Sequence, residues 1–230
     1  PSEVKFNVRE AGSVRSVREC VLKVEGLPSA INGQIVELKQ GGKGMIMGFN
    51  ENDIQVLILN AKASLRSGDE VYSRGESLHL PVGDRFLGRI VNALCEPLDN
   101  QGAIKEDALY PVFRDAPAVM DRVPLKETLE TGTLLINAVI PIAKGQRQLL
   151  IGDRLTGKTT IAVDAIINQK GKDVICVYCC MGKTQTSLMK LLNLLKLKGA
   201  LEYSIVVTAV ASCSMGEQYH AHYTAAMLGE

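Results

Sequence analysis

The sequence lacks several features that would place it in a specialised class of protein. It contains no Trp, and aromatic residues make up only 4% of its 230 residues. Its 26 Lys and Arg side chains are nearly balanced by 25 Asp and Glu, so charge does not indicate nucleic acid or an anionic membrane surface as a partner. No apolar run reaches the roughly 18 residues of a membrane-spanning helix, and the first residues, Pro1 to Lys5, lack the basic and apolar stretches of a secretory signal. We expect the chain to fold in water, with Pro1 either a processed end or the start of an excerpt.

Metal-ligand and disulfide patterns are also sparse. The six cysteines are scattered apart from Cys176, Cys179 and Cys180, and a chain able to build a full core does not need disulfides. Cys176 and Cys179 form C-x-x-C, but they lie in an apolar run, where strand positions three apart point to opposite faces. We therefore favour core packing over metal or redox chemistry. His220 and His222 have no third ligand at zinc spacing, which favours surface or interface histidines over a metal site.

The N-terminal third predicts a β-domain. Short β-rich segments are separated by Gly and Asn turns, and several strands this close together favour a small closed barrel or sandwich. We assign residues 1–75 to an N-terminal β-barrel, and expect it to pack against neighbours without catalytic residues. The expected strands are Ser13–Val24, Gln34–Leu38, Gly44–Phe49, Ile54–Leu59 and Glu70–Tyr72.

The remainder, residues 76–230, predicts a second domain of the α/β class. Five prolines mark residues 76–125 as an extended connecting region. From residue 146 strands and helices alternate, and the later strands are apolar throughout, as in a parallel sheet covered on both faces. The expected strands are Gln148–Ile151, Val174–Cys180 and Ser204–Val210, and the expected helices are Gly157–Gln169 and Thr186–Lys198.

One motif carries chemistry. The run from Gly152 to Thr159 matches G-x-x-x-x-G-K-[ST] and lies between an expected strand and an expected helix. Such a loop turns backbone N–H groups and a helix N-terminus toward a phosphate. Lys158 would add a charge at the β- and γ-phosphates, and the Thr159 hydroxyl would bind Mg²⁺. The candidate nucleotide-binding residues are Gly152, Asp153, Arg154, Leu155, Thr156, Gly157, Lys158, Thr159 and Thr160.

The residues for hydrolysis are missing from this part of the sequence. Breaking a phosphate bond requires a side chain that orients or deprotonates water, and an acidic group that holds the magnesium shell. No carboxylate follows the expected strands directly, and Lys183 stands where a water-polarising carboxylate is expected. Either the site binds without cleaving, or the domain is incomplete. We expect no catalytic residue in the chain.

The motif and its surroundings resemble one family, the α subunits of F-type ATP synthases. The resemblance rests on Lys144–Arg147, Leu150–Arg154, Thr156–Thr160 and Asp164–Gln169. It is supported by Pro81–Gly83, Leu87–Val91, Pro97–Asp99, Leu129–Thr133, Gln218, Tyr219 and Tyr223. Three positions depart from the family: Lys183 and Leu155 replace a usual Gln, and His222 replaces a usual Pro.

The resemblance implies a six-stranded barrel followed by a RecA-like P-loop domain whose parallel sheet is incomplete at residue 230. It implies Mg²⁺ and ATP held without turnover in an F1 sector, with partners in alternating β subunits, the central stalk γ subunit and the peripheral stalk. The chain would touch a membrane only through that complex, on the cytoplasmic face of a bacterial inner membrane or the matrix face of a mitochondrial one. The Walker B strand, an interface arginine and a helical bundle would follow Glu230.

Two alternatives remain open. The chain could be a catalytically competent RecA-like ATPase of the export type, whose acid lies beyond residue 230. It could also be a fragment retained only for its barrel contacts. If the chain binds nucleotide, we expect the charge of Lys183, where it points at the γ-phosphate, to favour triphosphate over diphosphate binding.

Overall fold

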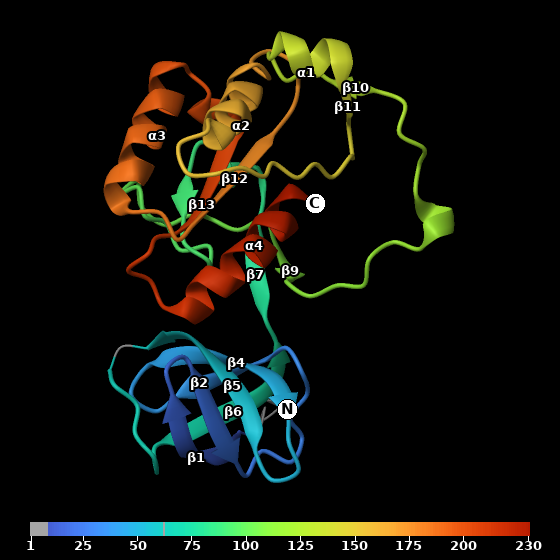
Figure 1. Cartoon of the computed structure of the whole chain (residues 1–230). Helices are drawn as coiled ribbons and strands as arrows, with labels where there is room; N and C mark the ends of the chain where they lie inside the picture. Colours follow the sequence, from blue (N-terminus) through green and yellow to red (C-terminus); the bar gives the residue numbers. More distant parts are fainter. Residues whose placement is uncertain (1–8, 62) are drawn as a thin grey trace, which may run out of the picture.

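The N-terminal part is a closed barrel of six antiparallel strands. The computed structural model describes residues 9–61 and 63–230, and in it the barrel forms the lower body of the molecule (Figure 1). The strand order around the barrel is β1-β2-β5-β4-β3-β6, which confirms the predicted barrel and the six strands that the family resemblance implied. The strands are β1 (Glu10–Arg18), β2 (Val21–Glu25), β3 (Gln34–Leu38), β4 (Gly42–Phe49), β5 (Ile54–Ala61) and β6 (Glu70–Ser77).

One predicted strand is two strands in the structure. Residues 13–24 are interrupted at Glu19, whose φ of 51° lies in the left-handed region. The chain reverses there, and β1 pairs with β2 as an antiparallel hairpin. Alternate side chains then fill the barrel interior, because successive residues of a strand face opposite sides. The interior residues include Val14, Leu22, Val24, Val36, Ile46, Val56 and Val71.

The second part is built on a short parallel sheet. Its order is β12-β13-β8, formed by β12 (Cys176–Met181), β13 (Ser204–Ala209) and β8 (Ile90–Val91). Helices α2 (Lys158–Ile167), α3 (Gln185–Leu197) and α4 (Met215–Gly229) pack around it (Figure 1). Strands β7 (His79–Val82) and β9 (Ala108–Pro111) form an antiparallel pair near the barrel. The sequence pattern predicted β12, β13, α2 and α3, but it did not predict α4.

The remaining elements are short. They are the 3-10 turns η1 (Asp84–Phe86), η2 (Val119–Asp121) and η3 (Leu201–Tyr203), the helix α1 (Leu134–Val139), and the strands β10 (Thr128–Leu129) and β11 (Ile142–Ala143). Strands β10 and β11 pair with each other. Within the described ranges, no helix has the length and apolar character needed to cross a membrane.

The predicted strand Gln148–Ile151 is absent from the sheet, so the expected βαβαβ unit is wrong at its first strand. Among the described residues this segment pairs with no other strand, and Leu149 and Ile151 are 75% and 83% exposed. An apolar run becomes a strand only when a neighbouring strand accepts its backbone hydrogen bonds. The run has the composition of a buried strand but no partner here.

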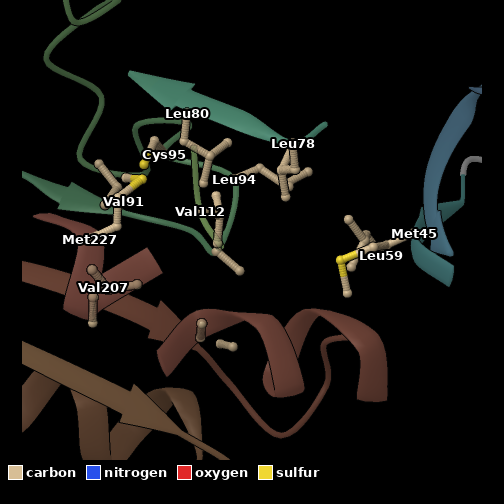
Figure 2. Packing of buried hydrophobic residues seen from close by; sticks show 14 of the residues in the cluster. Met45, Leu59, Leu78, Leu80, Val91, Leu94, Cys95, Val112, Val207 and Met227 are labelled. Carbon is tan, nitrogen blue, oxygen red and sulfur yellow. The ribbon is translucent and has the colours of Figure 1, made fainter. Parts of the chain in front are cut away.

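A single hydrophobic cluster joins the barrel to the second part. Figure 2 shows Met45 and Leu59 of the barrel in one cluster with Leu78 and Leu80, which follow the barrel, and Val207 of β13. The cluster also takes residues from the proline-rich region, including the fully buried Phe86 and Val91. Residues 76–125 therefore supply core side chains as well as connections. The division at residue 75 remains a prediction, and β6 runs to Ser77.

Candidate functional site

The Gly152–Thr159 segment forms a tight loop that leads directly into α2. Leu155 and Gly157 have φ angles of 64° and 91°, so the backbone passes twice through the left-handed region. The Thr156 hydroxyl donates to the Asp153 carbonyl oxygen at 2.9 Å. Gly157 is the residue that caps α2, and its conformation is one that glycine adopts at little cost. These features produce the curled backbone that the motif predicts.

Lys158 turns back over this loop. Its ammonium donates to the Gly152 carbonyl oxygen at 2.6 Å and also contacts the Asp153 carbonyl oxygen. The helix start beside it has no side-chain cap and no acidic residue in its first turn. Uncapped N–H groups and the helix dipole favour an anion at this end of α2. The ammonium and the helix N-terminus therefore form one region of positive potential.

Thr159 has a cationic partner. Its hydroxyl oxygen lies 3.2 Å from the Lys183 ammonium, which also lies 3.3 Å from the Tyr178 hydroxyl. Thr159 and Thr160 line a small cavity of about 200 Å³ between α2 and α3. Asp164 lines it as well, but Asp164 is five residues further along α2, which corresponds to about 8 Å of helix rise. The group nearest the Thr159 hydroxyl is an ammonium, where a metal site would have a carboxylate.

The donor set fits Mg²⁺ only in company with a polyphosphate. In the part of the chain that the structure describes, no three His, Cys, Asp or Glu side chains gather to hold a metal. Mg²⁺ commonly keeps several waters and takes phosphate oxygens together with one or two protein oxygens. Thr159 can supply one such oxygen. Bound there, Mg²⁺ would neutralise charge on the phosphates.

The far end of α2 is fixed by polar contacts. The Tyr203 hydroxyl donates to the carbonyl oxygens of Ile166 and Ile167 at 3.0 and 3.2 Å. The buried Gln169 side chain donates to the Glu130 carbonyl oxygen at 2.8 Å. Val163 packs into a cluster with Leu188, Leu191 and Leu195 of α3 and with Cys180 of β12. The loop is thus attached to a helix that is held at its C-terminal end and along one face.

The expectation that no carboxylate lies at the carboxyl end of the strands is wrong in one respect. Helix α4 returns over β13 and places Glu217 in a cavity of about 610 Å³ with Thr208 and Val210. Burial raises the pKa of Glu217. Sequence reasoning missed this residue because it lies eight positions after the strand, and only the path of α4 brings it back.

Glu217 does not face the loop. Its cavity is lined by Leu188, Met189, Leu192, Asn193 and Lys196 of α3. The cavity beside Thr159 is lined by Lys190, Leu191 and Leu194 of the same helix. At 100° per residue these two sets lie on opposite sides of α3. The helix therefore separates the Glu217 carboxyl from the Thr159 hydroxyl.

Cys179, Cys180 and His220 pack within the fold, whereas His222 lies at the surface. Cys179 packs against the cluster that joins the barrel, and Cys180 lies in the α2–α3 cluster, on the opposite face of β12. Burial raises the pKa of the Cys179 thiol to about 11. Of the two settings expected for the histidines, surface or interface, the surface is wrong for His220: it is buried, and its Nδ1 lies 3.2 Å from the Ala93 carbonyl oxygen. His222 is exposed and packs against the Tyr223 ring.

The chain is similar in sequence to one family of known proteins. Residues 132–230 match the family described as the ATP synthase alpha/beta family, nucleotide-binding domain. ATP synthase subunit alpha of Limosilactobacillus reuteri (strain DSM 20016) is 42% identical over 226 residues, which cover 98% of this chain and 44% of that protein. The same subunit of Wolinella succinogenes is 40% identical over 228 residues, covering 99% of this chain and 46% of that protein.

Residues 132–230 therefore carry sequence of the nucleotide-binding domain of the ATP synthase alpha/beta family. Over nearly its whole length, the chain is a relative of ATP synthase alpha subunits, which confirms the resemblance drawn from its residues. The chain spans less than half the length of these curated relatives.

Proposed function

We propose that the chain is the N-terminal portion of a non-catalytic, ATP-binding α subunit of an F1 sector. On this proposal residues 1–75 are the barrel, residues 76–230 are part of a RecA-like domain, and the site spans Gly152–Thr160. The observation that carries the proposal is the placement of the Lys158 ammonium beside an uncapped helix N-terminus, with Lys183 in contact with Thr159 in place of a carboxylate. Such a site attracts polyphosphate and has no adjacent base to activate water.

The binding step follows from the loop. The Lys158 ammonium would exchange its contacts with loop carbonyl oxygens for contacts with phosphate oxygens, while the first N–H groups of α2 donate to the same anion. A hydrogen bond to a charged group is worth about 1.5–3 kcal/mol, or about 10- to 150-fold in affinity. Thr159 would hold Mg²⁺ where a metal accompanies the nucleotide. Nothing in this step requires a proton acceptor.

The proposal includes an assembly. The relatives are named as subunits of ATP synthase, and on that basis the partners are β subunits in an alternating hexamer, the γ subunit of the central stalk and the peripheral stalk. The chain would then be peripheral on an energy-transducing membrane, either bacterial or mitochondrial. The near balance of charge supports protein partners over nucleic acid.

The test is binding and turnover on the purified chain. We expect calorimetric titration with Mg-ATP to show binding and a phosphate-release assay to show negligible turnover. Lys158→Ala should weaken the binding of ATP at least about tenfold, since one charge-assisted contact is lost. Lys198→Ala, at the exposed end of α3, is the matched control and should bind as the wild type does. Circular dichroism checks that both variants fold.

Two outcomes would contradict the proposal. Rapid hydrolysis that Lys158→Ala abolishes would instead support a catalytically competent, export-type ATPase. The absence of any heat with ATP, in a chain shown to be folded, would support a fragment retained for its barrel contacts.

A further inference from the structure

We propose that Lys183 is a built-in counter-cation for the phosphates, so that polyphosphate binding at this loop depends little on Mg²⁺. The inference rests on the proposed function, because it assumes that the loop binds a nucleoside triphosphate. It goes beyond that function by naming the charged form of the ligand: the metal-free anion binds nearly as well as the magnesium complex.

The backbone that carries Lys183 is held in place. Residues 182 and 183 follow the carboxyl end of β12, and Gly182 takes a φ of 63°. The Gly182 N–H donates to the Ala209 carbonyl oxygen at 2.9 Å, and the Ala211 N–H donates to the Lys183 carbonyl oxygen at 3.0 Å. One hydrogen bond to the last residue of β13 and one from the chain just after it therefore fix the backbone of Lys183 at the edge of the sheet.

The side chain itself has two polar partners. The ammonium lies 3.2 Å from the Thr159 hydroxyl and 3.3 Å from the Tyr178 hydroxyl, and the residue is half-buried. Tyr178 is on β12, whereas Thr159 is in the first turn of α2, so the lysine connects the sheet edge to the phosphate loop. A freely solvated surface lysine would make neither contact.

The position of this charge determines its effect. The Thr159 hydroxyl is the oxygen that the motif offers to Mg²⁺, and the ammonium donates to that same oxygen. A second cation near this point is repelled by the first, while a polyphosphate is attracted to both. With Lys158 on the loop and Lys183 beside it, two fixed positive charges do part of the neutralising that a divalent ion does in other phosphate loops.

The experiment compares ATP affinity with and without metal. The dissociation constant is measured by calorimetry in Mg²⁺ and in EDTA, for the wild type, Lys183→Gln and Lys183→Arg. We expect less than about a threefold change for the wild type on removing Mg²⁺. In EDTA, Lys183→Gln should bind ATP at least about tenfold more weakly than the wild type, which is the lower end of the effect of losing a charge-assisted contact. In Mg²⁺ the variant should recover most of this affinity. Lys183→Arg keeps the charge and should behave as the wild type does.

Lys196→Gln provides the matched control. Lys196 lines the Glu217 cavity on the opposite side of α3 from Thr159 and is exposed, so its loss should leave the metal dependence unchanged. If the wild-type chain binds ATP in Mg²⁺ but its affinity falls tenfold or more in EDTA, the inference is overturned while the proposed function stands. Equal EDTA sensitivity of Lys183→Gln and the wild type would also overturn it. The wild-type comparison needs no variant to fold, and failure of the wild type to bind ATP in either medium would overturn both proposals.

Discussion

Gly216, in the first turn of α4, lies directly against the Ile58 carbonyl in strand β5 of the barrel. A Cβ at position 216 would collide with that oxygen and lie 3.2 Å from the Leu57 side chain. Beside it, the Ser214 hydroxyl donates to the Leu59 carbonyl oxygen at 2.7 Å and accepts from the Glu217 N–H at 3.1 Å. One serine thus caps α4 and binds the barrel, and the glycine permits the close approach.

We expect Gly216→Ala to destabilise the chain. The added methyl group must push α4 away from β5, and overpacking of this kind costs about 1–3 kcal/mol, partly offset by the better helix propensity of Ala. Urea unfolding followed by circular dichroism measures the change in unfolding free energy. Gly48→Ala is the control, because a Cβ at position 48 in β4 meets nothing within 4 Å. A Gly216→Ala variant as stable as Gly48→Ala would contradict the close contact.

Acid stability should depend on the Arg89–Asp99 pair. The guanidinium donates from Nε and Nη2 to the Asp99 carboxylate at 2.5 and 2.9 Å, and the Asp99 side chain is 3% exposed. Bonding to Arg89 lowers the pKa of Asp99 to about 2. The folded pKa is below the unfolded value of about 4, so the stabilisation is present above pH 4 and is lost between about pH 4 and pH 2.

Asp99→Asn should therefore lower the unfolding free energy by about 2–3 kcal/mol at pH 7. The difference from the wild type should shrink as the pH falls toward 2, because the carboxyl of the unfolded wild-type chain is protonated below about pH 4 and must release its proton on folding. Urea titrations at pH 7, 4 and 2.5 test this. Asp121→Asn, at an exposed carboxylate in η2, should show no such trend. A difference that stays constant from pH 7 to pH 2.5 would show that the pair is not responsible.

Leu155 provides a test of affinity. It lies at the tip of the phosphate loop, is fully exposed and has a φ of 64°. The resemblance to the α-subunit family implies a Gln at this position that would reach the nucleotide. We expect Leu155→Gln to raise the affinity for ATP about two- to tenfold, which is the range for one added hydrogen bond. Leu197→Gln, at an 82% exposed position at the end of α3, controls for the loss of an exposed leucine. Calorimetry that shows unchanged affinity would exclude a contact from position 155.

Local patterns predicted much of this fold. Alternation identified the barrel strands, and helical spacing of leucines identified α3, which begins after Thr184 because the Thr184 hydroxyl accepts from the Ser187 N–H. The eight residues from Gly152 to Thr159 were enough to predict the phosphate loop, because its curled backbone depends on glycine and on the helix that follows. Periodicity and turn chemistry are properties of neighbouring residues, so the order of the sequence is enough to reveal them.

The failures have a different origin. Gln148–Ile151 has the composition of a buried strand, but strand formation requires a partner that composition does not specify. The positions of His220 and Glu217 were not predicted, because both depend on the path of α4: His220 is buried, and Glu217 lines a cavity with Thr208 and Val210. The sequence could show that Lys183 replaces an expected polar residue, but not what the lysine contacts.

The amino-acid order by itself determined most of the barrel strands, the phosphate-binding loop and the relationship to ATP synthase alpha subunits. Only the tertiary structure decided that Lys183 reaches Thr159, that Glu217 lies on the other side of α3, and that Gly216 meets the barrel. Each of these relationships joins residues distant in the chain. Their distances follow from how helices pack on the sheet and the barrel, which depends on all of the packed surfaces together.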